Sequence, residues 1–403
     1  MQAKQLSTLR NLLPLLLAAT AACTDAGELA ATSQPLLDPG TPWAIHTIAD
    51  DLLGADGHAL GDVTGDGVAD AAVAWEESSR VTIYERPAHP RDRWILRASY
   101  THSSVEDVAL CDLDGNGWLD VASAGEDKRL RVARNLGGGT FAPPVVIQTA
   151  ANVQQWTAVN CEKDWDGDGL VDLLAGGRLA VAPATTQVYL LRTSTPWVAG
   201  SWTKAAIGAA GWTMTIAVGD VDGDGLDDVL APDRLQAAPL VNGLRVFSLA
   251  TGAWVGRTIA PVVDGYTPRF VHLQRGGALA WAAVRESDQT SRLTLDGVRL
   301  PFPAGIGPVQ GVRIGDVDGD GLRDVVATTG EVGGHVQPTT NPGVILLRGA
   351  RGGGFEPQAY AISGPTGGKW DEADAVDVNG DGKLDVVTTE QRLGLGIVWL
   401  EQP

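Results

Sequence analysis

The chain has 403 residues and carries 49 Asp and Glu against 30 Lys and Arg, which gives a formal net charge of -19. A chain of this length suits one large domain, and no shift in composition divides it into two. The acidic balance, with no basic stripe to neutralise phosphates, excludes a nucleic-acid-binding protein.

The first residues have the pattern of an export signal. Lys4 and Arg10 precede an apolar run from Leu12 to Ala19, which is too short to cross a bilayer. We therefore predict a signal peptide at residues 1–22 and no transmembrane segment.

The small residues before Cys23 are typical of bacterial lipoprotein processing, so we predict that Cys23 accepts a lipid. Cleavage after Ala21 without lipidation remains the alternative. Residues 23–41 are polar and small and form a flexible tether in this interpretation. Either route predicts an exported bacterial protein, held at the outer membrane or cell surface or else secreted.

Six copies of one acidic loop follow, each with Asp at positions one and nine and Gly at positions four and six. Position three is Asp, Asn or Thr, and position five is Asp or Asn. Ca²⁺ takes roughly six to eight oxygen ligands, which alternate side chains and one backbone carbonyl can supply. We predict about six structural Ca²⁺ sites, held by Asp62, Thr64, Asp66, Val68 and Asp70; Asp112, Asp114, Asn116, Trp118 and Asp120; Asp164, Asp166, Asp168, Leu170 and Asp172; Asp220, Asp222, Asp224, Leu226 and Asp228; Asp316, Asp318, Asp320, Leu322 and Asp324; and Asp377, Asn379, Asp381, Lys383 and Asp385.

The EF-hand is the nearest alternative, but it requires a bidentate Glu at its twelfth position and a helix on each side. Neither is present. Each loop is followed instead by a β-rich run, and we predict strands at Ala71–Trp75, Val121–Ala124, Leu173–Ala175, Val229–Ala231, Val325–Thr329 and Val386–Thr389.

The first aspartates of successive loops lie 50, 52, 56, 96 and 61 residues apart, so one repeat is hidden in the interval of 96. A tryptophan precedes several of the loops by 18 or 19 residues, and Trp254 plus 18 gives His272. The segment His272–Ala280 occupies the place of a loop but offers no carboxylate. We interpret it as a seventh repeat without metal.

Repeats of about 50 residues with four short strand-like runs and no helical period favour a β-propeller. We predict an all-β, seven-bladed propeller over residues 42–403, with a calcium loop between the first and second strands of six blades. The last repeat ends after its third strand, Gly394–Glu401, and Trp43–Ile48 resembles the missing fourth. The N-terminal strand therefore closes the last blade and removes an exposed sheet edge.

The loops and their strand context resemble the FG-GAP or VCBS repeat family, whose propellers include the integrin α-subunit head and some fungal lectins. The resemblance implies calcium ligands at the six intact loops and none at the fifth repeat. Such a family constrains the fold and the metal more than the function.

Cys111 and Cys161 precede neighbouring loops and lie on neighbouring inner strands. A disulfide and a pair of small buried residues are both consistent with this placement.

A ligand is expected on the face opposite the loops. Trp156, Trp212 and Trp370 precede their loops by seven or eight residues, where an indole can contact a sugar or a cation; packing between blades is the alternative. Glu126, Arg129, Arg178 and Arg234 lie in the connections from second to third strands, where a mixed ring of charge can bind carboxylates of an acidic polysaccharide, or simply face solvent.

Catalysis has little support in the sequence, and we predict no catalytic residue. His102 and Tyr100 enter blade two, where they can meet Lys128 or Arg129 across the mouth; an exposed loop histidine is the plainer interpretation. We predict a calcium-stabilised surface module that binds a glycan or an extracellular protein. The alternatives are a polysaccharide lyase or sugar dehydratase, and an adhesion or scaffold protein.

Overall fold

The strands that follow the acidic loops are buried along almost their whole length, which explains their unbroken Val, Ala, Leu and Thr content. The strands β4 (Asp70–Trp75), β8 (Asp120–Gly125), β16 (Asp228–Asp233), β24 (Asp324–Thr329) and β28 (Asp385–Glu390) are buried at every position. A strand covered on both faces needs neighbours on both sides. The fold provides them because each blade is packed between two others.

The computed structural model describes residues 36–38, 41–149, 154–179, 186–234, 243–250, 252–275, 277–285, 287–303, 306–330, 343–364 and 368–403. These residues form strands and turns and contain no helix. The predicted signal peptide 1–22, Cys23 and most of the 23–41 tether lie outside the described residues.

Seven sheets follow one another along the chain, and the first five each contain four antiparallel strands in sequence order. The sixth has β23 to β26 with β1 added at its edge, and the seventh has β27 to β29 with β2 as its fourth strand. Besides those named above, the strands of the first three blades are β3 (Ala55–Gly61), β5 (Arg80–Glu85), β6 (Ile95–Thr101), β7 (Val105–Cys111), β9 (Arg129–Ala133), β10 (Val145–Thr149), β11 (Gln154–Lys163), β12 (Asp172–Leu179), β13 (Thr186–Arg192) and β14 (Thr203–Ala210). The later blades add β15 (Ala217–Gly219), β17 (Gly243–Ala250), β18 (Ala253–Pro261), β19 (Tyr266–Leu273), β20 (Leu279–Arg285), β21 (Ser291–Leu295), β22 (Val298–Arg299), β23 (Val309–Gly315), β25 (Val344–Gly349), β26 (Phe355–Ala361), β27 (Trp370–Val376) and β29 (Gly396–Glu401).

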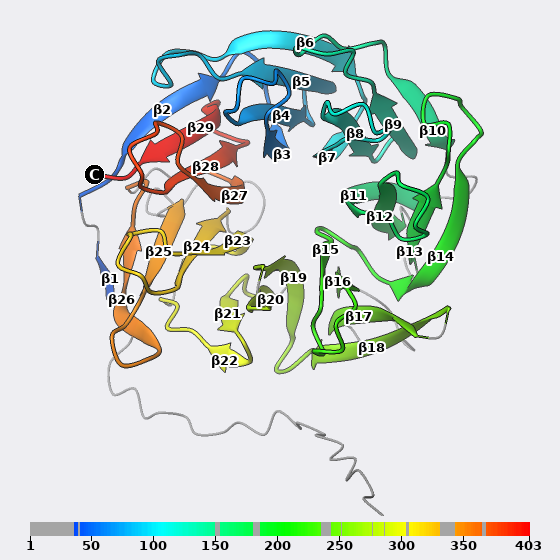
Figure 1. Ribbon diagram of the computed structural model, residues 1–403. Coiled ribbons are helices and arrows are strands. Elements are labelled where there is room, and N and C mark those ends of the chain that lie inside the picture. Colours follow the sequence, from blue (N-terminus) through cyan, green and yellow to red (C-terminus); the bar gives the residue numbers. More distant parts are fainter. Residues whose placement is uncertain are drawn as a thin grey trace, which may run out of the picture. The chain divides into compact units, whose positions relative to one another are not determined.

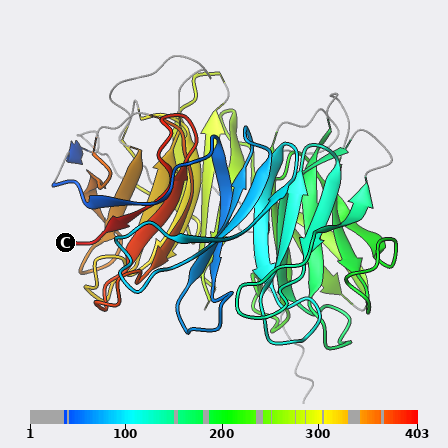
Figure 2. The same ribbon diagram turned by 90° about the horizontal axis from the view of Figure 1, so that it is seen from above.

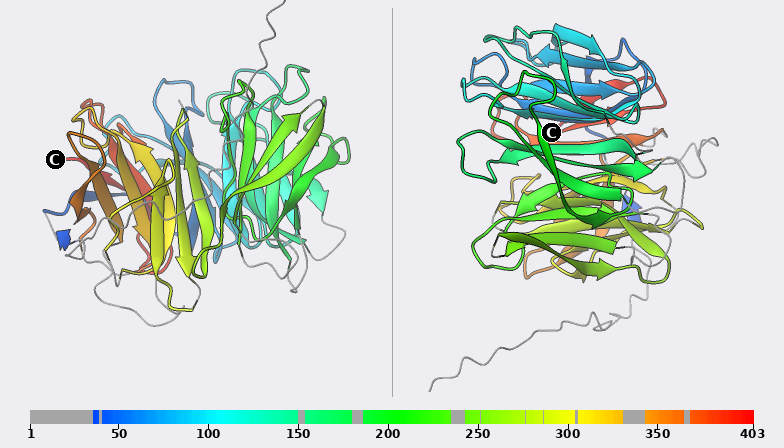
Figure 3. Two further views of the ribbon diagram at one scale, coloured as in Figure 1. Left: turned by 90° about the horizontal axis from the view of Figure 1, so that it is seen from below. Right: turned by 90° about the vertical axis from the view of Figure 1, so that its right-hand side faces the viewer.

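Figure 1 shows the blades arranged as a ring, with the first strand of each blade nearest the centre. The predicted seven-bladed all-β propeller is confirmed, including the fifth blade, β19 to β22, which has no acidic loop. In Figures 2 and 3 the strands run between two rims where the connections gather. We call the rim with the turns between first and second strands the loop face, and the opposite rim the connection face.

The seventh blade contains strands from both ends of the described chain. The strand β2 (Ala44–Ala49) pairs antiparallel with β29, from Ala44 opposite Glu401 to Ala49 opposite Ile397. In Figure 1 the blue β2 lies beside the red β29. The short strand β1 (Leu36–Asp38) adds to the sixth blade by pairing parallel with β26.

The hydrophobic core is divided among the blade interfaces. The described residues form seven clusters of buried side chains, and each cluster draws its members from two neighbouring blades. The cluster between blades two and three also contains Cys111 and Cys161, which form a disulfide between β7 and β11. The sequence was consistent with either a disulfide or two small buried residues, and the structure contains the disulfide.

Candidate functional site

The loop face is built from six turns with nearly identical backbones. The fourth-position glycines have φ between 71° and 80°, and the sixth-position glycines have φ between 84° and 93°. Such positive φ values are costly for residues with a Cβ, so the backbone alone favours glycine at these positions. At Gly167 and Gly169, for example, an added Cβ would meet nothing within 4 Å.

The first aspartate of each loop organises the turn around itself. Its carboxylate accepts the amide of the sixth-position glycine in all six loops, over 2.7 to 3.0 Å. In the third blade Asp164 also accepts the amide of Gly167 at 2.7 Å. These bonds lower the pKa of Asp164 and Asp220, because backbone N–H groups favour the ionised carboxylate.

The ninth aspartate begins the second strand and is buried in every loop. Its carboxylate accepts the amide of the second loop position over 2.8 to 3.1 Å. In blades one, two, six and seven its other oxygen accepts an amide at the end of the third strand or just beyond it. Burial raises the pKa of Asp120 to about 7 and those of Asp172 and Asp324 to about 6, so a nearby cation would be strongly favoured.

Several loops hold their carboxylates close enough for a metal ion. Three carboxylates have oxygens within 4.8 Å of one another in the loops that start at Asp112, Asp164, Asp220 and Asp316. Asp114 Oδ1 and Asp316 Oδ1 are buried without a hydrogen-bond partner among the described residues. An all-oxygen set with such orphaned atoms fits Ca²⁺, which these side chains could bind.

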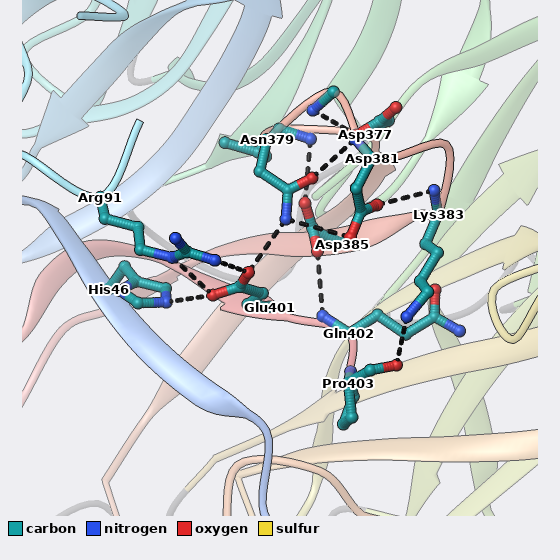
Figure 4. Close-up of polar contacts among 12 residues, drawn as sticks. His46, Arg91, Asp377, Asn379, Asp381, Lys383, Asp385, Glu401, Gln402 and Pro403 are labelled. Atoms are coloured by element: carbon teal, nitrogen blue, oxygen red, sulfur yellow. Dashed lines mark hydrogen bonds and ion pairs between the residues drawn. The ribbon is translucent and has the colours of Figure 1, made fainter. Parts of the chain in front are cut away.

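Arginines contact the third-position aspartates from the neighbouring strands and turns. Arg134 lies 2.6 Å from Asp114, and Arg257 lies 2.9 Å from Asp222. In the loop of the seventh blade the third position is Asn379, whose amide donates to Glu401 at 3.0 Å (Figure 4). These contacts fix the third position while leaving other oxygens of the loop for an ion.

The fifth repeat has a different turn in place of the loop. The amide of Gln274 donates to the carbonyl of Ala278 at 2.8 Å, which closes a short hairpin between β19 and β20. Asp296, in the turn after the third strand, accepts the amide of Leu279 at 2.8 Å at the start of β20. Burial and Arg313 lower the pKa of His272 to about 3, and its Nδ1 accepts the amide of Ile314 at 3.2 Å.

A central channel of about 1560 Å³ is lined by residues from all seven blades. His58 Nε2 lies 3.3 Å from Asp374 Oδ2, and Arg313 lies 2.6 Å from the other oxygen of Asp374. Burial opposes ionisation of Asp374, but Arg313 and His58 outweigh it and lower its pKa. Burial and Asp107 raise the pKa of Glu372 to about 8. The sequence prediction missed these residues, although they occupy similar positions three to five residues before their loops.

The connection face brings part of the predicted ligand site together. Arg178 forms an ion pair with Glu126 and donates to Gln155 at 3.1 Å. The guanidinium groups of Arg178 and Arg234 lie 4.3 and 4.0 Å from the ring of Trp212. Trp212 is half-buried, and its position between two arginines makes it the centre of this group.

Other predicted ligand residues are placed elsewhere. Trp156 and Trp370 are fully buried, so they pack between blades and offer no ring face to a ligand. His102 is also fully buried, where Nδ1 lies 2.8 Å from Ser123 Oγ; it is neither an exposed loop residue nor part of the mouth. Burial lowers its pKa. Arg129 is exposed and contacts Asp127 at 3.1 Å.

Comparison with known proteins agrees with the geometry of the repeats. The FG-GAP-like repeat family matches residues 112–175, 164–231 and 316–388. Together with the seven blades, these matches define the class: the chain belongs to the FG-GAP repeat β-propeller family. FG-GAP repeats are typical of extracellular or surface proteins, and a propeller of this family is a binding or scaffold module.

Solved structures share the fold at low sequence identity. BBS1N in complex with ARL6DN, soaked with mercury, has a TM-score of 0.54 and 11% identity, over 91% of this chain and 98% of that chain. The same complex soaked with lead gives 0.51 and 11%, over 91% and 96%. The computationally designed Ika8 protein gives 0.47 and 11%, over 89% and 100%. No curated protein matches the chain. Within the described residues, no helix is long and apolar enough to span a membrane.

Proposed function

We propose that the protein is a calcium-stabilised module that binds a carboxylate-bearing glycan through the connection face. The observation that carries this proposal is the half-buried Trp212 between Arg178 and Arg234, beside Glu126. Trp212 holds the two guanidinium groups by cation–π contacts, and arginines can bind the carboxylates of a sugar with two parallel hydrogen bonds. Together, the carboxylate of Glu126 and the guanidinium groups of Arg178 and Arg234 orient the ligand.

The test is a glycan-array screen of residues 24–403 in calcium buffer, with Trp212→Ala beside the unchanged protein. Trp254→Ala is the matched control, because Trp254 is a half-buried tryptophan on the outer strand β18. We expect binding to acidic glycans that is lost in Trp212→Ala and kept in Trp254→Ala. A blank array, or equal loss in both variants, argues against the site and favours a protein partner.

The calcium part of the proposal is supported by the repeated loop geometry and its orphaned carboxylate oxygens. Without a cation the crowded carboxylates of each loop repel one another, so removal of calcium is expected to lower the melting temperature markedly. The loops with four aspartates at their ligand positions, which start at Asp164, Asp220 and Asp316, should empty last. Calorimetry with and without a chelator checks this; an unchanged melt of demonstrably metal-free protein would contradict it.

Export and lipidation at Cys23 remain part of the proposal on the evidence of the sequence pattern and the family's usual location. Labelled palmitate should be incorporated into the expressed full chain and not into Cys23→Ala. Equal labelling of both proteins, or labelling of neither, would reject Cys23 as the lipid acceptor.

A further inference from the structure

A second group of carboxylates lies apart from the repeat loops. Asp56, Glu76 and Glu106 each place one oxygen within 4.8 Å of the others. Asp56 is near the start of β3, Glu76 directly follows β4, and Glu106 is near the start of β7. Because β3 and β7 run towards the loop face, these residues belong to the connection face. We call them the carboxylate cluster.

The charge of the carboxylate cluster is only partly balanced. Lys369 Nζ lies 3.7 Å from Asp56 Oδ1 and 3.0 Å from Asp371 Oδ1. One ammonium group thus faces four carboxylates. Burial and Asp56 raise the pKa of both Glu76 and Glu106, since like charges at this separation oppose ionisation. The neighbouring Glu126 is already paired with Arg178.

Two buried side chains beside the cluster have oxygens without partners. Gln391 is 5% exposed, and its Nε2 donates to Glu76 Oε2 at 2.8 Å. Oε1, on the same planar amide, has no hydrogen-bond partner among the described residues. Asp371 is likewise 5% exposed, and its Oδ2 has no partner there. A buried oxygen without a donor is costly, so its presence beside three carboxylates points to a cation.

We propose that Asp56, Glu76 and Glu106 bind one Ca²⁺, with Gln391 as a further oxygen ligand. The donor set is entirely oxygen, which selects a hard cation over zinc or copper. Oxygens on opposite sides of Ca²⁺ are separated by roughly 4.6 to 5.2 Å, so a set whose oxygens all lie within 4.8 Å of one another fits around this ion. This ion would differ from those of the repeat loops because it joins side chains of blades one, two and seven.

The chain contains a repeat signature for this site. Asp371, Asp56 and Glu106 all precede the first aspartate of their loops by six residues, and Gln391 and Glu76 both follow it by 14. The side chains six residues before the first aspartate therefore form one layer, and those 14 residues after it form a second layer, around the same part of the ring. In blades three and four the same first position holds Ala158 and Met214, which cannot bind a metal.

Equilibrium dialysis of residues 24–403 at about 1 mM calcium, within the range used by extracellular calcium sites, counts the bound ions. We expect Glu106→Gln to bind one ion fewer than the unchanged protein. Glu162→Gln, a carboxylate of the central channel, is the matched control and should bind the same number. An equal count for Glu106→Gln overturns the proposal. If Glu106→Gln fails to fold, Asp56→Asn replaces it.

Melting temperatures distinguish a metal site from carboxylates that merely share protons. In the absence of calcium, Glu106→Gln should have a higher melting temperature than the unchanged protein, because the substitution relieves repulsion between carboxylates. Addition of calcium should raise the melting temperature of Glu106→Gln less than that of the unchanged protein. Lys369→Met removes the competing ammonium and should tighten calcium binding. If calcium raises the melting temperature of all three proteins equally, the carboxylates share protons without a metal ion, and the proposed site is rejected. Retained glycan binding in Glu106→Gln separates this result from the fate of the proposed ligand site.

Discussion

The conformation of single glycines determines whether each acidic loop can form. Gly169 has φ of 93°, and an added Cβ would touch nothing, so its replacement tests the backbone alone. Gly169→Ala should cost about 1 to 2 kcal/mol of unfolding free energy in urea, because an L-residue resists positive φ. Gly169→Asn should lose less, since Asn tolerates that region. Equal losses in the two variants would mean that the backbone is not the cause.

His272 in the fifth blade should make stability depend on pH. Its pKa of about 3 in the folded state lies below the ordinary 6.5, so the unfolded chain takes up the proton first as pH falls. Stability from this group is complete above pH 6.5 and is lost towards pH 3, at up to about 1.4 kcal/mol per pH unit.

His272→Asn keeps an acceptor for the Ile314 amide without titrating, so its unfolding free energy should fall less over that window in calcium buffer. His89→Asn, at an exposed histidine, is the control and should follow the unchanged protein. Parallel pH profiles for His272→Asn and the unchanged protein would show that His272 does not titrate in this way.

At the scale of single residues, the sequence predicts the residues of a repeated turn better than it predicts which side chains are buried. The fourth and sixth loop glycines were predictable because the loop repeats six times with one spacing. The burial of His102 was not predicted, and packing between blades was only one of two interpretations of Trp156, since burial depends on how close the next blade lies. The carboxylate cluster was also overlooked, because the shared spacing of Asp56 and Glu106 carries its meaning only once the blades are placed side by side.

At the scale of strands, predicted and observed elements agree because composition and turn chemistry act together. The predicted run Val386–Thr389 lies inside β28, and Val121–Ala124 lies inside β8. Strand ends were less certain, since β12 continues to Leu179, well beyond the predicted Leu173–Ala175. There the ladder with β11 extends past the apolar run, which sequence composition does not reveal.

The disulfide between β7 and β11 ties two neighbouring inner strands whose cysteines are 50 residues apart. Constraining such a loop in the unfolded chain should stabilise the fold by about 2 to 4 kcal/mol. Replacing both cysteines by alanine should lower the urea midpoint of unfolding by a corresponding amount. A reductant should have the same effect on the unchanged protein under unfolding conditions and none on the double variant; an unchanged midpoint for the double variant would contradict the prediction.

On the scale of the whole ring, the buried apolar side chains of the described residues gather at seven similar interfaces between blades, and stability depends on these interfaces. The number of blades could be predicted from the spacing of the loops, because a repeat must stack on its neighbours to bury its faces. What the spacing could not give is the identity of the groups that meet across blades. The contact of Gln391 with Glu76, for example, joins residues 315 positions apart.

The seam between β2 and β29 makes the ring depend on its closing strand. Ile48 of β2 is fully buried beside Trp399 and Trp94, and the amide of Trp94 donates to the carbonyl of Ile48 at 3.2 Å. At the same seam, Glu401 accepts hydrogen bonds from Arg91 and Asn379 and lies 2.7 Å from His46 (Figure 4). If this seam is weakened, the closed ring can open into a stack of blades with two exposed sheet edges.

Ile48→Ala should therefore cost about 2 to 5 kcal/mol, as a large-to-small change in a core. Because every blade packs between two others, we expect hydrogen exchange to speed up around the ring and the thermal transition to remain single. Glu401→Gln weakens the polar side of the same seam, which is partly exposed, and should shift the midpoint less. Faster exchange confined to β2 and β29, with the other blades unchanged, would show instead that each blade is stable by itself and that closure adds only a local contact.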